Sequence, residues 1–234
     1  AAGLAHEIRN PIASIGVQCG LLRTRHRNEA KILSSVEMME REIGKVDYII
    51  RECLNFVRPT ELGARPVAVC TFLRRIASET TKLFKEIRIV YRDEGVADAT
   101  VEMDGALMEQ ALANIVTNAA QACVAGGEVA ITSRITHSYW DLDPDARDPF
   151  LPGGTGERED FLMITIKDNG PGIPESIRDK IFVPFFTTKK DGTGIGLPMA
   201  QKIIYAHRGV IDILSGEDIG TEFIIKIPVR QTHV

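Results

Sequence analysis

The sequence is poor in cysteine, in basic clusters and in long apolar runs, and each shortage excludes a class of protein. Its four cysteines, Cys19, Cys53, Cys70 and Cys123, lie far apart and form no paired motif, which argues against a disulfide framework or a zinc site. No apolar run approaches the roughly 20 residues that a transmembrane helix needs. The formal net charge is -4 and there is no dense Lys/Arg block, so no nucleic-acid partner is expected. We therefore expect a cytoplasmic chain with reduced thiols and no membrane segment.

The composition is otherwise that of an ordinary globular protein. Hydrophobic residues make up 44% and charged residues 26% of the 234 residues, a length that suits one large domain or two small ones. The chain begins with Ala-Ala-Gly-Leu inside an apolar pattern of helical spacing. We therefore expect it to be a fragment that further segments precede.

The first part of the chain has the apolar spacing of two long helices. One apolar series runs from Leu4 to Ile15 and a second, wider one from Ile32 to Val57, with a turn at 26–28 between them. A two-helix hairpin cannot bury such stripes alone, which predicts a dimer that forms a four-helix bundle. The alternative is that the hairpin packs on the rest of its own chain. The residue before Pro59 avoids the helical region, so the second helix should end there.

The remaining chain mixes helices and strands. We expect a helical hairpin over 1–60, a linker over 61–66 and an α/β sandwich over 67–234. Apolar spacing and turn residues predict the sandwich elements, namely helices at 71–85, 104–124 and 197–207 and strands at 87–91, 100–103, 127–136, 161–167, 210–214 and 221–228. Asp104 can cap the second of these helices. The Pro-, Gly- and acid-rich segment 137–160 is expected to be a long hairpin connection.

Two local motifs contain side chains suited to a nucleotide. In NIVTNAAQA, Asn114 and Asn118 share one helix face, where two amides can hold a hydrated cation or contact phosphate, although exposed helix asparagines are also ordinary. DNGPGI has the composition of a simple turn. It can also place the Asp168 carboxylate against the exocyclic amine of adenine, with Gly170 and Gly172 letting the backbone approach a planar ligand.

Two further motifs follow. FVPFFTTKK, at 182–190, is by itself an apolar turn with a basic tail. GTGIGL, at 192–197, opens a predicted helix, and its alternating glycines expose N–H groups at the positive end of the helix dipole, which is a physical anion site. It lacks the Lys-Ser/Thr of a Walker loop and departs from the dinucleotide-binding spacing.

In this order, after a hairpin bearing HEIRNPI, the motifs resemble the transmitter core of bacterial sensor histidine kinases over essentially the whole chain. HEIRNPI resembles the phosphoacceptor box, NIVTNAAQA the asparagine box, DNGPGI and GTGIGL the two glycine boxes, and FVPFFTTK the phenylalanine box. HEIRNP and PFFTTK are most similar to the nitrogen-regulation type. The resemblance implies an α plus α/β fold, in which a hairpin that dimerises into a four-helix bundle precedes an ATP-binding sandwich of the GHKL type.

The resemblance also implies a reaction. It predicts ATP-dependent autophosphorylation on His6, transfer of the phosphoryl group to an aspartate of a response regulator receiver domain, and a phosphatase step on the phosphorylated regulator. Glu7 matches the general base or orienting acid, and Asn10 matches the residue that helps water attack the regulator. In the family a sensor domain precedes this core. The protein is expected to act as a homodimer in the cytoplasm.

The cofactors implied by the resemblance are ATP and Mg²⁺. Asn118 matches the Mg²⁺ ligand, Asn114 supports it or the phosphates, and Asp168 matches the adenine acceptor, beside Gly170 and Gly172. Further nucleotide contacts are implied for Lys189, Gly192, Thr193, Gly194, Gly196, Leu197 and Thr221. Many family members have a basic residue where this chain has Gln121. We therefore expect Lys189 or Lys190 to supply that cation, the alternative being a solvated lysine pair.

Some alternatives remain. Pro11 removes an N–H that the Glu7 carbonyl would accept, so it either lets the helix flex beside His6 or simply curves a bundle helix. A gyrase-like or chaperone ATPase and a serine kinase are rival enzymes, but His6 on a dimerising hairpin argues against them. A degenerate ATP-binding scaffold is a third reading, against which the intact His6, Asn118 and Asp168 argue. The four other histidines show no ligand spacing and are given no role, namely His26, His137, His207 and His233.

Overall fold

The computed structural model describes residues 2–58, 61–136, 160–189, 192–216 and 219–230. The chain divides into two compact units, Ala1–Pro59 and Thr60–Val234, which are described separately. The predicted hairpin connection falls almost wholly on residues outside the described ranges, as do Lys190, His137 and His233.

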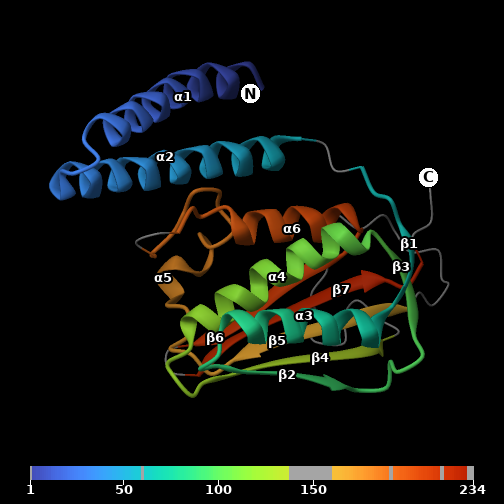
Figure 1. Ribbon diagram of the computed structural model, residues 1–234. Helices are drawn as coiled ribbons and strands as arrows, with labels where there is room; N and C mark the ends of the chain where they lie inside the picture. The colour runs from blue at the N-terminus through green and yellow to red at the C-terminus, as the bar shows by residue number, and fades with distance from the viewer. Residues whose placement is uncertain (1, 59–60, 137–159, 190–191, 217–218, 231–234) are drawn as a thin grey trace. The chain divides into compact units, whose positions relative to one another are not determined.

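The first unit is a helical hairpin of α1 (Ala2–Arg25) and α2 (Ala30–Val57), as predicted (Figure 1). The turn lies at residues 26–28, and beside it His26 Nδ1 lies 2.8 Å from Glu29 Oε1. After α2, Arg58 has extended dihedrals (φ -62, ψ 142), because the residue before a proline is kept out of the helical region.

The helix α1 continues through Pro11, since a proline inside a long helix removes one backbone hydrogen bond without ending the helix.

The hairpin leaves much of its apolar surface in solvent. Cys19 and Val36 are buried, whereas large apolar side chains on both helices are more than a third exposed, namely Ile15, Val17, Leu21, Leu22, Met38, Met39, Val46, Tyr48, Ile49 and Val57. Two helices alone therefore do not cover the predicted stripes.

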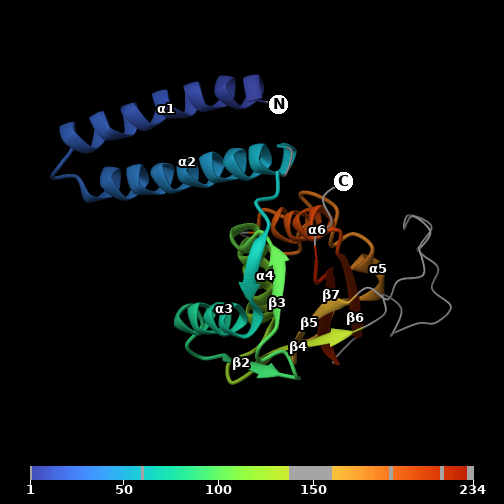
Figure 2. The same ribbon diagram turned by 90° about the vertical axis from the view of Figure 1, so that its right-hand side faces the viewer.

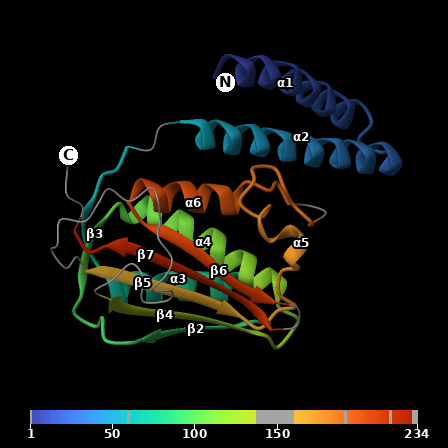
Figure 3. The ribbon, with the colours of Figure 1, turned by 180° about the vertical axis from the view of Figure 1, so that it is seen from behind.

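The second unit is a five-stranded sheet with helices along one face (Figures 1 and 3). In spatial order the strands are β2 (Arg88–Asp93), β4 (Glu128–Thr136), β5 (Phe161–Asp168), β7 (Gly220–Pro228) and β6 (Val210–Gly216). Only β2 and β4 pair in parallel; the other neighbours are antiparallel. The covering helices are α3 (Val69–Leu83), α4 (Gly105–Ala122) and α6 (Gly196–Ala206).

Two short elements were not predicted. The strand β1 (Arg65–Ala68) pairs antiparallel with β3 (Thr100–Met103), as Figure 2 shows, and α5 (Glu175–Arg178) is a single turn. The strand β1 begins at Arg65, inside the predicted linker 61–66. It is only four residues long and contains a proline, so it lacks the alternation and β propensity that identify a strand in sequence.

The predicted hairpin of β4 and β5 is confirmed by its register. Thr136 pairs with Phe161 at the open end, and Val129 pairs with Asp168 at the other. This register places Asp168 at the last position of β5. The core is formed by the sheet and by the buried stripe of α4, whose members are Met108, Ala111, Leu112, Ile115, Val116, Ala119 and Ala120. The hydrophobic burial of this stripe, about 1.5–3 kcal/mol for each large side chain, fixes α4 against the sheet.

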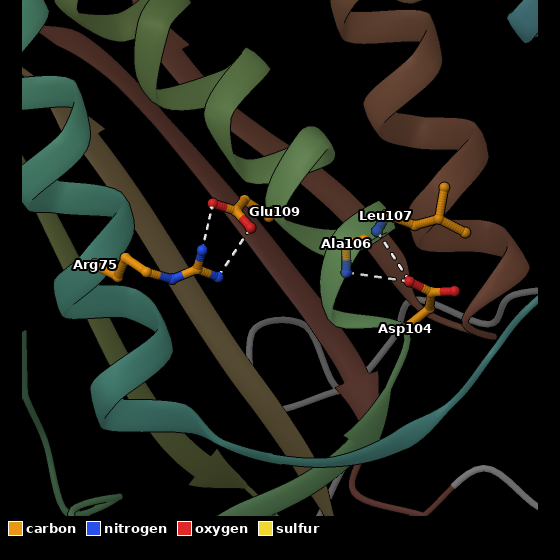
Figure 4. A network of polar contacts seen from close by, with 5 residues as sticks. All are labelled: Arg75, Asp104, Ala106, Leu107 and Glu109. Atoms are coloured by element: carbon orange, nitrogen blue, oxygen red, sulfur yellow. Dashed lines mark hydrogen bonds and ion pairs between the residues drawn. The ribbon is translucent and has the colours of Figure 1, made fainter.

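The N-terminus of α4 is capped by Asp104, as predicted. Its Oδ1 accepts hydrogen bonds from the backbone N–H groups of Ala106 and Leu107, both at 3.1 Å (Figure 4). Its Oδ2 accepts from the N–H of Gly63 at 3.0 Å. Burial alone would raise the pKa of Asp104, but these three donors outweigh it and lower the pKa below its usual value. The cap fixes the start of the helix that carries Asn114 and Asn118.

An ion pair joins α3 to α4. The Arg75 guanidinium binds the Glu109 carboxylate through two parallel hydrogen bonds, Nη1–Oε1 at 2.9 Å and Nη2–Oε2 at 2.8 Å (Figure 4). Both side chains are partly exposed, so the pair contributes little to the free energy of unfolding and mainly sets the orientation of the two helices.

His207, to which no role was assigned from its sequence spacing, connects α6 to the start of α4. Its side chain is fully buried. Its Nε2 accepts from the backbone N–H of Asp104 at 2.9 Å, so its Nδ1 carries the proton and donates to the Ile203 carbonyl at 2.8 Å. Burial lowers the pKa of His207, although the Ile203 hydrogen bond and the Asp104 carboxylate oppose this shift. The neutral imidazole is therefore part of the fold.

This arrangement makes stability depend on pH. The folded-state pKa of His207 lies below the unfolded value of about 6.5, so the stabilisation is complete above about pH 6.5 and is lost as the pH falls below it. We expect the free energy of unfolding, measured with urea, to decrease between pH 7.5 and pH 5.5, with a slope from this residue of at most about 1.4 kcal/mol per pH unit. The non-titrating His207→Gln variant should show a smaller decrease. An equal decrease in the two proteins would contradict the assignment.

Candidate functional site

The Asp168 carboxylate lies at the end of β5 and is only 3% exposed. Its Oδ1 accepts from two backbone N–H groups, that of Gly170 at 2.9 Å and that of Thr221 at 3.2 Å. Within the described residues its Oδ2 accepts no hydrogen bond. Burial raises the pKa of Asp168, and the two N–H donors counteract part of the shift. One oxygen therefore serves the fold while the other remains for a ligand donor.

The loop after β5 contacts the β6–β7 hairpin closely. Gly172 has a φ of +79, and a Cβ there would lie 1.9 Å from the Gly216 carbonyl oxygen, so only glycine fits. Ser215 Oγ accepts from the N–H of Ile173 at 2.8 Å and lies 3.0 Å from Thr221 Oγ1. These contacts place Thr221 beside Asp168 and next to the DNGPGI motif.

The second glycine motif lies against α4. The Asn114 amide donates to the Gly196 carbonyl at 3.1 Å, where α6 begins. The N–H groups of this first turn have no helical acceptor, and Ile195, at the N-cap, provides no side-chain cap. Gly194 has a φ of +67, and its carbonyl accepts from the N–H of Phe185 at 2.9 Å. Within the described part of the chain, the start of α6 thus presents unpaired N–H donors of the kind that bind anions.

Asn118 lies one turn further along α4 and contacts a lysine of the loop before α6. The Lys189 ammonium donates to Asn118 Oδ1 at 2.8 Å and to Gln121 Oε1 at 2.6 Å. Partial burial lowers the pKa of Lys189. The structure therefore brings a cation to the amide oxygen for which the family resemblance implies a Mg²⁺ contact. It also brings together Asn118 and Lys189, which are far apart in sequence.

The other predicted residues are placed as follows. Gly192 and Thr193 precede α6, and Gly196 and Leu197 form its first turn. His6, Glu7 and Asn10 all lie on α1, in the helical unit, and the Asn10 side chain is exposed. The α/β unit contains all the other predicted site residues.

Two residues near the site were missed as contributors. Ser215 bridges Thr221 and the loop after β5, and Gln121 binds the Lys189 ammonium. Ser215 could have been found from the sequence by predicting a hairpin whose two strands are joined by GEDIG. In the register of that hairpin, Ser215 pairs with Thr221. Nothing in the sequence alone pairs Gln121 with a residue 68 positions away.

The described residues contain no group of three or more His, Cys, Asp or Glu side chains that could hold a metal ion. The Asn118 amide oxygen is of a type that Mg²⁺ accepts as a ligand beside phosphate oxygens and water. None of the described helices combines the length and hydrophobicity needed to cross a membrane.

Comparisons with known proteins agree with this division of the chain. Residues 1–62 match the model of the His Kinase A (phospho-acceptor) domain, and residues 103–231 match that of the histidine kinase-, DNA gyrase B- and HSP90-like ATPases. The chain is 32% identical to the signal transduction histidine-protein kinase AtoS of Escherichia coli K12, over 98% of this chain and 34% of AtoS.

Two solved structures share the fold. Full-length ShkA in complex with AMPPNP superposes with a TM-score of 0.73 at 23% identity, covering 100% of this chain and 46% of ShkA. ThkA in complex with the response regulator TrrA gives a TM-score of 0.63 at 26% identity, covering 97% of this chain and 60% of ThkA.

The chain spans between a third and a half of the length of the curated relatives it matches first. The phosphoacceptor match separates it from the gyrase-like and chaperone ATPases, which the second model also describes. It belongs to the two-component sensor histidine kinases, as a transmitter core in which a phosphoacceptor hairpin precedes a GHKL-type ATPase domain.

Proposed function

We propose that this chain phosphorylates itself on His6 with ATP and transfers the phosphoryl group to an aspartate of a response regulator. The main support is that one chain combines HEIRNPI, inside the phosphoacceptor match, with an ATPase domain in which Asp168 has a free acceptor oxygen. In this proposal residues 1–60 form the domain that dimerises and accepts the phosphoryl group. Residues 61–66 link it to the nucleotide-binding domain, which spans residues 67–234.

The nucleotide residues fit adenine. Asp168 Oδ1 is held by the N–H groups of Gly170 and Thr221, so Oδ2 can accept the exocyclic amine of adenine. It would repel the carbonyl that guanine has at the same place. Gly172 lets the loop after β5 pack against Gly216 of the β6–β7 hairpin. Thr221, whose N–H donates to Asp168 Oδ1, would form the floor of the site.

The phosphate end fits a triphosphate with Mg²⁺. The N–H groups at the start of α6 would donate to phosphate oxygens, since Ile195 provides no side-chain cap there. The loop residues assigned to the phosphates are Gly192, Thr193, Gly194, Gly196 and Leu197. Asn118 Oδ1 already accepts a hydrogen bond from a cationic group, the Lys189 ammonium, and this contact supports its assignment as the Mg²⁺ ligand. Asn114 supports Asn118 from one turn away. A bound Mg²⁺ would neutralise part of the phosphate charge.

The reaction needs a nucleophile and little other covalent help. An imidazole nitrogen of His6 attacks the γ-phosphorus, the N–P bond forms, and the bond to the ADP oxygen breaks. Glu7 accepts the imidazole proton or orients the ring. The phosphoryl group then passes from His6 to a carboxylate oxygen of the regulator. Asn10, one helical turn from His6, orients water for hydrolysis of the phosphorylated regulator.

The assembly follows from the hairpin. Its exposed apolar side chains, among them Met38, Tyr48 and Val57, need a cover, which a second copy supplies in a four-helix bundle. The structure of ThkA with TrrA supports a regulator as the second partner. A sensor domain on the same polypeptide and a cytoplasmic location complete the proposal.

The test is incubation of the chain with Mg-ATP labelled at the γ-phosphate, followed by addition of a receiver domain. We expect label that is stable to alkali and labile to acid, as phosphohistidine is, and its passage to the receiver. Label stable to acid would indicate a serine kinase. ATP binding without any label would indicate the scaffold alternative.

A further inference from the structure

The Lys189 ammonium contacts Gln121 as well as Asn118. Gln121 follows Asn118 by three positions on α4, so the two side chains share a helix face. Their oxygens both accept from the Lys189 ammonium, at 2.6 Å for Gln121 Oε1 and 2.8 Å for Asn118 Oδ1. Two amides of one helix therefore hold one cation from a loop.

The lysine is directed into this contact by its own loop. The Lys189 N–H donates to Thr187 Oγ1 at 3.1 Å, and the Lys189 carbonyl accepts from the N–H of Gly192 at 3.2 Å. A Cβ at Gly192 would lie 2.5 Å from Thr187 Oγ1, so a larger residue there would displace the hydroxyl that accepts from Lys189. The contact is thus built from two sides, by the loop and by α4.

The partners of the ammonium are both neutral. Among the residues that the structure describes, no carboxylate pairs with Lys189. Amide oxygens satisfy the N–H donors of an ammonium without neutralising its charge. The charge consequently stays available to an anion at the phosphate end of the site, beside the N–H groups of α6.

The contact also competes with a metal. If Asn118 Oδ1 coordinates Mg²⁺, as the proposed function has it, the ammonium must leave that oxygen, because two cations so close repel strongly. Gln121 Oε1 then remains as the partner that keeps Lys189 beside the phosphates.

We propose that Lys189 is the phosphate-binding cation of this site and that Gln121 is its positioning residue, holding the ammonium in reach when Mg²⁺ takes Asn118. This inference rests on the proposed ATP binding. It explains how the site can supply a cation to the phosphates although position 121 of α4 is a glutamine and not a basic residue.

The test is a double-mutant cycle on the full chain, with calorimetric titration of Mg-ATP. We expect Lys189→Gln to weaken binding about 10–100-fold, as the loss of a charge-assisted hydrogen bond does. Gln121→Leu should weaken it about 3–10-fold when Lys189 is present and have no effect in the Lys189→Gln background. Moving the charge to the helix in Lys189→Gln/Gln121→Lys should restore most of the affinity.

Lys82→Gln is the matched control, because it removes an equal charge from an exposed position on α3. Thermal unfolding of each variant checks that it folds. Equal losses from Gln121→Leu in both backgrounds, or no loss from Lys189→Gln while the wild-type chain binds Mg-ATP, would overturn this inference alone. A wild-type chain that does not bind Mg-ATP would overturn the proposed function, and this inference with it.

Discussion

Replacement of His6 by glutamine is expected to abolish incorporation of label from γ-labelled Mg-ATP completely. Glutamine is polar and suits a helix, so α1 should form, but its amide nitrogen is not nucleophilic and no N–P bond can form. Because the proposed reaction has one acceptor atom, no residual slow rate is expected. The measurement is label retained on the protein after alkali, compared with the wild-type chain.

The control for this variant is nucleotide binding. His6 lies in the helical unit and the nucleotide residues in the α/β unit, so the affinity for Mg-ATP should stay within about twofold of the wild type. Label on the His6→Gln protein would mean that another residue accepts the phosphoryl group. The assignment of HEIRNPI as the acceptor segment would then be wrong.

Replacement of Asp168 by asparagine is expected to weaken Mg-ATP binding about 100-fold or more and to leave the fold intact. Asparagine keeps the oxygen that accepts from Gly170 and Thr221. Its second atom becomes an NH₂ donor, which faces the amine of adenine donor to donor. A lost charge-assisted hydrogen bond together with an unpaired buried donor accounts for a change of this size. Calorimetric titration measures it.

The stability of the Asp168→Asn chain provides an independent check. Burial raises the folded-state pKa of Asp168, so the ionised carboxylate opposes folding at neutral pH, and this cost disappears as the pH falls through the folded-state pKa. The variant carries no such charge. Its melting temperature should equal or exceed that of the wild type at pH 7.5, and the difference should narrow on acidification. A large drop in melting temperature would show that the carboxylate serves the fold itself.

The sequence predicts the elements whose signals are local. Apolar spacing identifies the helices α1, α2 and α4. An aspartate at the start of a helical pattern identifies Asp104 as an N-cap, and alternation of apolar residues identifies the central strands. The strand β1 is not predicted, because a segment of four residues that includes a proline has no recognisable periodicity. The burial of His207 is not predicted for another reason. The sequence around a histidine does not indicate whether its side chain is solvent-exposed or buried.

The site is predictable as a set of motifs but not as a set of contacts. The motif order indicates which residues bind nucleotide, and the structure adds that Asp168 holds Thr221 and that Lys189 holds Asn118. The second contact joins residues 71 positions apart, through side chains that have many rotamers. Only the packing of the loop against α4 determines it.

The two carboxylate oxygens of Asp168 have different roles, and this difference has an evolutionary consequence. Aspartate and asparagine codons differ by one base, and the substitution keeps the oxygen that Gly170 and Thr221 require. Under the proposed function, a single base change would therefore remove ATP binding and leave the fold intact. The variant chain would keep the hairpin and the sheet, and it would act as a dimerisation partner without kinase activity.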